Sequence, residues 1–280
     1  MDIGTVSKLL KYTKTKTALL DADVINYVAA SSAQRDYGTE VWSDIKGAIA
    51  DAEEQIFKEM EQAGCNKVLL IYSPRTSTNW RKLVMPAYKM HRKATPKPIC
   101  YMELRDELEK RYDHISIDWL EGDDLFAMLE AKIPNAVVVS IDKDMYTLPD
   151  IEYLRPHTMA FPAYTSRDYA DYYWLYQVLI GDSTDGYKGL LGTGPKKAEK
   201  LLSEFMEIGI DDNGQQTHDF DFEGAWNAVV SAYREKGQMN WLEQAQMARI
   251  LRVGDYDSKN KRIRLFNPDK EEWLQLPIKG

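Results

Sequence analysis

The sequence VVVSIDKD occupies residues 137–144 and decides the class of fold. Three valines in a row predict a buried strand, and two aspartates follow it closely. Four further β-branched or apolar runs are expected to be strands, each ending in a polar cluster, at 17–20, 68–72, 115–120 and 151–154.

Longer segments with a helical pattern separate these strands. Apolar residues recur with a period near 3.6 between residues 43 and 63, and the segment 102–111 has a similar pattern. Alternating strands and helices predict an α/β fold, in which helices flank a mostly parallel central sheet. After about Tyr172 the strand pattern fades, and we expect a helical second region that ends in a hairpin over 255–266. The helices predicted there cover 172–180, 195–205, 222–236 and 241–251.

The composition is that of an ordinary globular protein. The chain has 280 residues, 36 basic against 44 acidic residues, and a net charge of -8. A chain of this length buries roughly three quarters of its unfolded surface, enough for one large domain or a domain with a smaller lobe. Its cysteines, Cys65 and Cys100, form no CxxC pair, which favours a reducing compartment. No apolar run approaches the ~18 residues of a membrane span, so we expect a cytoplasmic protein.

Positive charge is concentrated in one part of the chain. The segment 62–102 contains no Asp or Glu but has eight Lys and Arg residues. Such a segment in an acidic protein favours a local contact with phosphates, and a solvated basic loop is the alternative. Lys89 and Arg92 are spaced i, i+3, so both could reach one phosphate if this part is helical. Tyr88 could stack on an unpaired base, whereas Trp80 is expected in the core.

Acidic residues gather where the predicted strands end. A turn of sequence GDSTDG at 181–186 adds two more after a predicted helix. The carboxyl ends of parallel strands share one crevice, so these side chains are expected to converge. Each pair taken alone also fits a helix cap or a turn. The acidic residues concerned are Asp21, Asp23, Glu121, Asp123, Asp124, Asp142, Asp144, Asp182 and Asp185.

A cluster of carboxylates requires positive charge. Two like charges ~5 Å apart repel by about 3 kcal/mol at an effective dielectric constant near 20. Oxygen ligands without nearby His or Cys select Mg²⁺ or Mn²⁺, and the four histidines show no metal-ligand spacing. Two such ions about 3.5 to 4 Å apart are typical of phosphodiester chemistry. The pattern therefore predicts a metal-dependent nuclease or phosphatase.

A glycine-rich turn, GLLGTGPKKA, occupies residues 189–198 and resembles a helix-hairpin-helix element. Gly192 and Gly194 expose backbone N–H groups in a tight turn, and the proline that follows suits a first helical position. Lys196 and Lys197 lie at the start of the predicted helix, so the turn could hold a phosphate backbone without reading bases. The alternative is a purely structural joint between two helices.

These motifs together resemble the flap endonuclease superfamily of structure-dependent 5′ nucleases, and in particular the short 5′→3′ exonucleases of T-odd phages. The order and spacing of the acidic motifs carry the resemblance, with support from 79–82, 86–92 and 246–251. It implies a PIN-like α/β nuclease core over residues 1–175. A basic helical arch around 74–100 is inserted in this core, and a helical duplex-DNA-binding region with a helix-three-turn-helix element follows over 176–280.

The resemblance also implies roles for single residues. Lys89 and Arg92 match the catalytic basic pair of the arch, which positions the scissile phosphate and supports charge in the transition state. The first metal cluster is matched by Asp21, Glu121 and Asp123, with Asp124 beside them. The second is matched by Asp142, Asp144, Asp182 and Asp185. The expected DNA-binding residues are Arg81, Lys82, Tyr88, Gly192, Gly194, Lys196 and Lys197.

By the same resemblance, the expected activity is hydrolysis at 5′ ends of duplex DNA by two Mg²⁺ ions, for which Mn²⁺ substitutes. Nicks, flaps and the RNA strand of RNA:DNA hybrids are further substrates of the family. A K⁺ ion often accompanies the helix-three-turn-helix element. No membrane contact is expected, the host cytoplasm is the expected location, and the sequence names no protein partner.

One position departs from the family. An Asp usually follows the second strand of the family, whereas Ser73 and Pro74 follow residue 72 here. One alternative interpretation, based on this departure, is a nuclease-like DNA-binding module that has lost catalysis. A second alternative is a small-molecule phosphatase that uses Asp21 and Asp23 as a DxD pair, but it leaves the basic segment and the glycine turn without a role.

Overall fold

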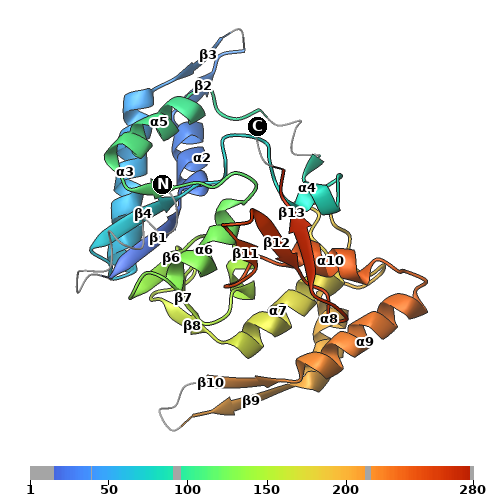
Figure 1. Ribbon diagram of the computed structural model, residues 1–280. Coiled ribbons are helices and arrows are strands. Elements are labelled where there is room, and N and C mark those ends of the chain that lie inside the picture. The colour runs from blue at the N-terminus through green and yellow to red at the C-terminus, as the bar shows by residue number, and fades with distance from the viewer. Residues whose placement is uncertain (1–15, 39, 91–95, 212–215, 278–280) are drawn as a thin grey trace. The chain divides into compact units, whose positions relative to one another are not determined.

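The computed structural model describes residues 16–38, 40–90, 96–211 and 216–277 (Figure 1). The chain forms two compact units, each with its own internal packing. The first comprises the described residues up to Thr78, those from 96 to Lys143, and Ile151–Tyr164; the second comprises the remainder. Among helices in these ranges, none is long and apolar enough to cross a membrane.

A six-stranded sheet forms the centre of the first unit (Figure 1). The strand order is β5-β4-β1-β6-β7-β8, and the pairs β5-β4, β4-β1, β1-β6 and β6-β7 are parallel. This confirms the predicted α/β class. The strands are β1 (Thr17–Asp21), β4 (Lys67–Ile71), β5 (His114–Ile115), β6 (Ala136–Val139), β7 (Ile151–Leu154) and β8 (Ala163–Thr165).

Helices cover both faces of this sheet because its strands are apolar on both faces. Side chains such as Leu20, Leu70 and Val139 share one core with α2, α3 and α5. Their sequence neighbours point to the opposite face, where α6 packs against β1, β4 and β6. The helices are α2 (Ala22–Ser32), α3 (Ile45–Gln62), α5 (Tyr101–Arg111) and α6 (Gly122–Glu130). A small hairpin, β2 (Gln34–Asp36) with β3 (Val41–Ser43), lies between α2 and α3 in sequence.

The second unit is mainly helical. It holds the short helix α4 (Arg81–Val84), most of the 3₁₀ helix η2 (Lys143–Thr147), and α7 (Arg167–Ile180), which packs against α8, α9 and α10. The remaining helices are α8 (Pro195–Leu202), η3 (Ser203–Phe205), α9 (Phe222–Glu235) and α10 (Trp241–Ala248). A three-stranded sheet closes the chain, with β11 (Tyr256–Asp257), β12 (Arg262–Leu265) and β13 (Glu272–Gln275).

Some elements differ from the sequence-based expectation. The run 115–120 is a strand only at His114–Ile115, and Trp119 adopts a positive φ of 74° beyond it. The hairpin β9 (Met206–Ile210) with β10 (Gln216–Phe220) is absent from the prediction, because β9 alternates over only five residues and β10 is polar until Phe220. The predicted domain boundary between 175 and 176 stays a prediction.

The two compact units interleave along the sequence, because the segments 79–90 and 144–150 pack with the C-terminal residues.

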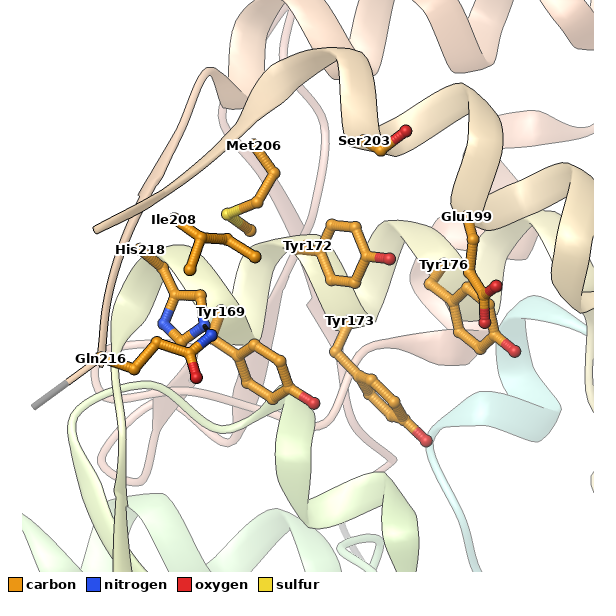
Figure 2. A pocket seen from close by; sticks show the side chains of 10 residues that line it. All are labelled: Tyr169, Tyr172, Tyr173, Tyr176, Glu199, Ser203, Met206, Ile208, Gln216 and His218. Atoms are coloured by element: carbon orange, nitrogen blue, oxygen red, sulfur yellow. Dashed lines mark hydrogen bonds between the residues drawn. The ribbon is translucent and has the colours of Figure 1, made fainter. Parts of the chain in front are cut away.

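Helix α7 presents two different faces. Trp174, Leu175 and Val178 are buried in the unit. The other face carries four half-buried tyrosines, which line a groove of about 450 Å³ together with residues of α8, η3 and the β9–β10 hairpin (Figure 2). These are Tyr169, Tyr172, Tyr173 and Tyr176. We call this the tyrosine groove.

Candidate functional site

Asp21 and Asp142 follow neighbouring parallel strands of the first unit, as predicted. Asp21 is the last residue of β1 and also caps α2, because its Oδ1 accepts a 3.3 Å hydrogen bond from Val24 N. Ser140 joins the two strand ends: its hydroxyl donates to Asp21 Oδ2 at 2.8 Å and accepts from Asp142 N at 3.1 Å. The hydroxyl of Tyr153 donates to the carbonyl of Asp142 at 2.7 Å, which holds this segment in place.

The carboxylates at these two strand ends favour a bound cation. Burial, and then repulsion from Asp23 and Asp142, raise the pKa of Asp21 to about 7, although hydrogen bonds from Ser140 and Val24 oppose the shift. Burial and the neighbouring carboxylates therefore both disfavour a negative charge on Asp21 when no cation is bound. A divalent cation would relieve the repulsion between these oxygen ligands.

Ser73, which follows β4 where the resemblance led us to expect an Asp, has a structural role. Its N–H donates to Asp23 Oδ2 at 2.7 Å, and its hydroxyl accepts from Gly122 N at 3.0 Å. The other oxygen of Asp23 accepts a 2.9 Å bond from the Tyr101 hydroxyl. Asp23 is thus held by two donors, and Ser73 ties the end of β4 to the start of α6.

Three acidic residues stand at the N-terminus of α6, where the helix dipole stabilises negative charge. Glu121 is the N-cap, and Asp123 lies in the first turn. Asp124 is fully buried, and its Oδ2 accepts a 3.2 Å hydrogen bond from the backbone N–H of Glu121. Asp124 therefore serves as a helix cap, which is the structural role that its sequence position allowed.

The second unit holds a separate group of carboxylates in the loop 181–189. Asp182 Oδ1 accepts hydrogen bonds from Thr184 N at 2.7 Å and Asp185 N at 3.2 Å. Gly181 makes the loop possible: its φ is +70°, and a Cβ there would lie 2.4 Å from the backbone carbon of Lys188. Only glycine fits this close approach of two backbone segments.

Asp144, Asp182 and Asp185 are all near the buried phenol of Tyr187. Burial, followed by repulsion from these three carboxylates, raises the pKa of Tyr187 well above its ordinary value. Asp144 is oriented by Gln177, whose Nε2 donates to Asp144 Oδ1 at 2.5 Å. The second unit therefore contains three of the predicted metal ligands, each of which raises the pKa of the same phenol.

The basic segment is anchored to Asp185. The Tyr88 hydroxyl donates to Asp185 Oδ2 at 2.7 Å, and Lys89 Nζ lies 3.4 Å from Asp185 Oδ1. Lys89 adopts a positive φ of 54°, and its N–H donates to the carbonyl of Asp185 at 2.9 Å. Arg92, the predicted partner of Lys89, lies outside the described residues.

Two predicted DNA-binding side chains are buried instead. Tyr88 is 1% exposed, so its ring is not available to stack on a base. Arg81 is 2% exposed; its guanidinium lies 4.5 Å from the Trp80 ring centroid, and its Nη2 donates to the carbonyl of Arg249 at 2.8 Å. Both side chains have structural contacts here: the Tyr88 hydroxyl donates to Asp185, and Arg81 contacts aromatic rings and a backbone carbonyl. Lys82, the neighbour of Arg81, is half-buried.

The glycine turn has the predicted form. Gly194 is the N-cap of α8 and Pro195 occupies its first turn. Gly192 has a φ of +70°, and a Cβ at either glycine would meet no atom within 4 Å, so this backbone is open to a ligand. Lys196 and Lys197 are exposed, and Lys197 Nζ donates to the carbonyl of Gly192 at 2.7 Å.

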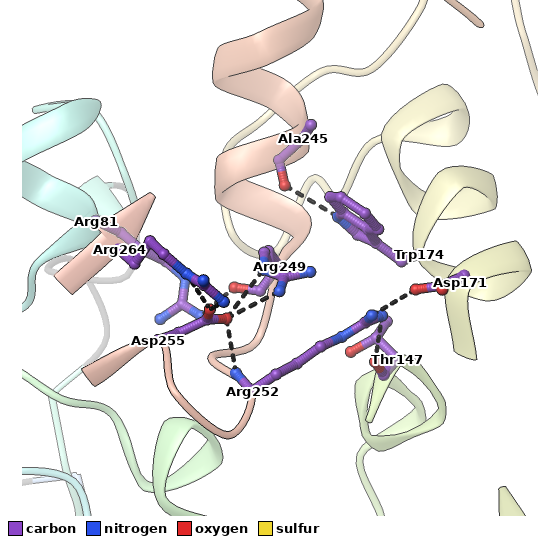
Figure 3. A network of polar contacts seen from close by, with 9 residues as sticks. All are labelled: Arg81, Thr147, Asp171, Trp174, Ala245, Arg249, Arg252, Asp255 and Arg264. Carbon is purple, nitrogen blue, oxygen red and sulfur yellow. Dashed lines mark hydrogen bonds and ion pairs between the residues drawn. The ribbon is translucent and has the colours of Figure 1, made fainter. Parts of the chain in front are cut away.

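A polar network within the second unit was not predicted from the sequence (Figure 3). Asp255, which is 1% exposed, accepts hydrogen bonds from Arg249 Nη2 at 2.9 Å, Arg264 Nη2 at 3.1 Å and Arg252 N at 3.0 Å. Arg252 pairs with Asp171, and its Nη2 donates to the carbonyl of Thr147 at 3.1 Å. The Thr147 hydroxyl in turn donates to the carbonyl of Asp144 at 2.7 Å, so the network positions a predicted metal ligand.

No group of three or more His, Cys, Asp or Glu side chains is arranged to hold a metal ion in the part of the chain that the structure describes. The chemistry of the donors still fits a hard cation, since every candidate ligand offers carboxylate oxygen. Convergence of all the predicted carboxylates on a common crevice stays a prediction.

Comparison with known proteins identifies the family. No family model matches the chain. The exonuclease of Escherichia phage T7 is 30% identical over 280 aligned positions, which cover 89% of this chain and 93% of that protein. The chain belongs to the family of these phage exonucleases. The exodeoxyribonuclease of Enterobacteria phage T3 is also 30% identical, over 89% of this chain and 92% of its own length. A flap endonuclease Xni of Vibrio parahaemolyticus is 26% identical over 59% of this chain and 70% of its own.

Solved structures confirm the fold. The T5 D15 protein co-crystallised with metal ions matches with a TM-score of 0.54 and 15% identity, over 83% of this chain and 93% of that chain. The T5 D15 flap endonuclease in complex with DNA and metal ions matches with a TM-score of 0.50 and 14% identity over the same shares. The 5′ nuclease fold expected for this phage exonuclease is therefore observed.

Proposed function

We propose that this phage exonuclease hydrolyses phosphodiester bonds at the 5′ ends of duplex DNA, in the 5′→3′ direction, with divalent cations as cofactors. The observation that carries the proposal is that the Ser140 hydroxyl joins Asp21 and Asp142 at the ends of neighbouring parallel strands. Three carboxylates around Tyr187 in the second unit add to it. Relatives named exonuclease and flap endonuclease support both activities for this chain, on 5′ ends, nicks and flaps.

The carboxylates of each unit would bind the cations. In the first unit these are Asp21, Glu121, Asp123 and Asp142, with Asp124 as a buried support. In the second unit they are Asp144, Asp182 and Asp185. When bound, Mg²⁺ or Mn²⁺ supplies an activated water and stabilises the leaving oxygen. The donor set is all oxygen, which fits either ion.

The basic residues of the chain would neutralise the phosphate. Lys89 Nζ is already beside the proposed ligand Asp185, at 3.4 Å, so it can meet the charge that develops on the scissile phosphate. Arg92 would share this role. Hydrolysis breaks the bond between phosphorus and the 3′ oxygen, which leaves a 5′ phosphate on the product.

The glycine turn would grip the duplex. Open backbone at Gly192 and Gly194, together with exposed Lys196 and Lys197, suits a phosphate contact without base readout. Lys82 would add charge, and a K⁺ ion would bind at the turn. The family relationship extends the proposed substrates to the RNA strand of RNA:DNA hybrids and the site of action to the host cytoplasm.

The test is release of nucleotides from a duplex labelled at one 5′ end and from a 5′-flap duplex, each with Mg²⁺ and with EDTA. We expect Mg²⁺-dependent release that starts at the labelled 5′ end. Asp142→Asn and Asp144→Asn should abolish turnover while DNA binding survives. Asp150→Asn, at a solvent-exposed ion pair with Arg167, is the matched control and should keep full activity.

Other outcomes select the alternatives. Tight DNA binding with no cleavage would identify a DNA-binding module that has lost catalysis, which the structural role of Ser73 favours. Rapid turnover of a phosphomonoester in place of DNA would identify a phosphatase. Equal release from 3′ ends would contradict the proposed direction.

A further inference from the structure

The tyrosine groove has no role in the proposed nuclease chemistry. Its four tyrosines are spaced i, i+3, i+4 and i+7, so they project from one face of α7 (Figure 2). The groove lies wholly within the second unit and measures about 450 Å³, a volume typical of sites that take a small ligand or a few side chains.

Contacts between the rings fix the walls of the groove. The Tyr169 ring stacks against Tyr172 at a centroid distance of 6.3 Å and against Tyr173 at 6.2 Å. Tyr172 also meets the edge of Phe220 at 5.8 Å. Rings held in this way offer ordered π faces, and the negative face of an aromatic ring attracts cations.

A carboxylate lies at one end of the groove. Glu199 of α8 lines that end, and it contributes, after burial, to the raised pKa of the Tyr172 hydroxyl. Glu199 therefore places negative charge beside the aromatic walls.

Helix α8 separates this groove from the lysines expected to bind DNA. Glu199 and Ser203, four residues apart, face the tyrosines. Lys197 and Lys200 line a different groove, beside α9. Glu204 and Glu235 line that second groove as well, so it carries both charges. Among the residues that the structure describes, the lining of the tyrosine groove has a carboxylate and no lysine or arginine.

The floor of the groove continues into exposed apolar surface. Met206 and Ile208 of β9 line it, and Ile208 is 65% exposed. Ile210, two residues further along the same face of the hairpin, is 77% exposed. The chemistry that matches this surface is positive charge flanked by apolar side chains.

We propose that the tyrosine groove binds an arginine or lysine side chain of a partner protein, carried on a short apolar segment. The cation lies over the tyrosine faces near Glu199, and the apolar neighbours of the cation cover Ile208. The proposal does not depend on the nuclease function, because it uses none of the proposed metal ligands or DNA contacts.

The test is fluorescence polarisation with the full-length protein and a short labelled peptide that alternates leucine and arginine. Tyr172→Leu removes the π face but keeps an apolar side chain against Phe220, and Glu199→Gln removes the charge. Each change should weaken peptide binding by about three- to thirty-fold, as expected for a cation–π or ionic contact. Tyr172→Phe keeps the π face and should retain binding.

Two controls distinguish peptide binding in the tyrosine groove from non-specific attraction to an acidic protein. Glu204→Gln removes a carboxylate of η3 that lines the other groove, beside α9, and should leave binding unchanged. A peptide with citrulline in place of arginine keeps the shape but loses the charge, and it should bind at least about tenfold more weakly. Unchanged thermal midpoints establish that the variants are folded.

Two results would overturn the proposal. One is peptide binding that is absent, or that does not respond to Tyr172→Leu and Glu199→Gln. The other is preferential binding of single-stranded oligothymidylate that requires Tyr172 and not Glu199. The second result would assign the groove to unstacked bases instead of a protein partner.

Discussion

The Tyr88 hydroxyl donates a 2.7 Å hydrogen bond to Oδ2 of Asp185, a residue that lies 97 positions away in the sequence. The next residue, Lys89, approaches Oδ1 of the same carboxylate at 3.4 Å. The basic segment is therefore attached to a proposed metal ligand through two adjacent side chains. Groups that orient a ligand in this way tune metal affinity without touching the metal.

Tyr88→Phe should raise the Mg²⁺ concentration needed for half-maximal nuclease activity by about tenfold, because the hydrogen bond that orients Asp185 is lost. The rate at saturating Mg²⁺ should change less. A Mg²⁺ titration of duplex cleavage measures both. Tyr37→Phe, at a tyrosine that is 71% exposed, is the control and should leave the titration unchanged. An unaltered Mg²⁺ requirement in Tyr88→Phe would remove Tyr88 from this role.

Gly181→Ala should lower the free energy of unfolding by about 3 to 5 kcal/mol, because a positive φ and a clash act together. The added Cβ would lie 2.4 Å from backbone of Lys188. Gly192→Ala is the matched control: its φ is also +70°, but its Cβ would meet open space, so a loss of only about 1 to 2 kcal/mol is expected. Urea denaturation measures the difference, and equal losses would show that the clash is relieved.

Asp255→Ala should destabilise the protein by about 3 to 5 kcal/mol, because it leaves the largely buried guanidinium of Arg249 without its carboxylate. The backbone N–H of Arg252 and the exposed Arg264 side chain lose the same partner. Asp257→Ala, at the end of β11, removes an ion pair with the more exposed Arg262 and should have a smaller effect. Thermal unfolding of both variants checks this. A small loss for Asp255→Ala would mean that the surrounding arginines find other partners or reach solvent.

Glu59→Gln should stabilise the protein at neutral pH. Glu59 is 6% exposed in α3, and burial raises the pKa of its carboxyl, although a hydrogen bond from Gln55 and the charge of His157 oppose this. The pKa of Glu59 is higher in the folded state than in the unfolded state. Its contribution to the free energy of unfolding is therefore fully present when the pH is below the ordinary pKa of a glutamate, and it is lost as the pH rises.

The melting temperatures of wild-type and Glu59→Gln protein should therefore coincide at low pH and separate as the pH rises past the usual range of a glutamate. Glu54→Gln, at an exposed ion pair with Lys58, is the control. Its melting temperature should not rise above that of the wild type as the pH increases. A difference that is constant with pH would show that Glu59 does not ionise as proposed.

Local patterns were enough to predict much of the sheet and its polar edge. Three valines in a row at 137–139 form β6, and Asp142 follows as expected. The glycine turn was likewise predictable, because a proline after two glycines suits only the start of a helix such as α8. The hairpin β9–β10 was not, since the alternation covers only the five residues of β9 and the partner strand is mostly polar.

The sequence by itself determined which residues have strand and helix patterns, where carboxylates follow strands, and that one segment is basic. These features depend on residues close together in the chain, so the pattern carries them. Only the tertiary structure decided that Arg81 and Tyr88 are buried, and that Ser73 and Ser140 hold the strand ends. It also decided that a stripe of tyrosines lines a groove, because burial and hydrogen bonding depend on neighbours that are distant in sequence.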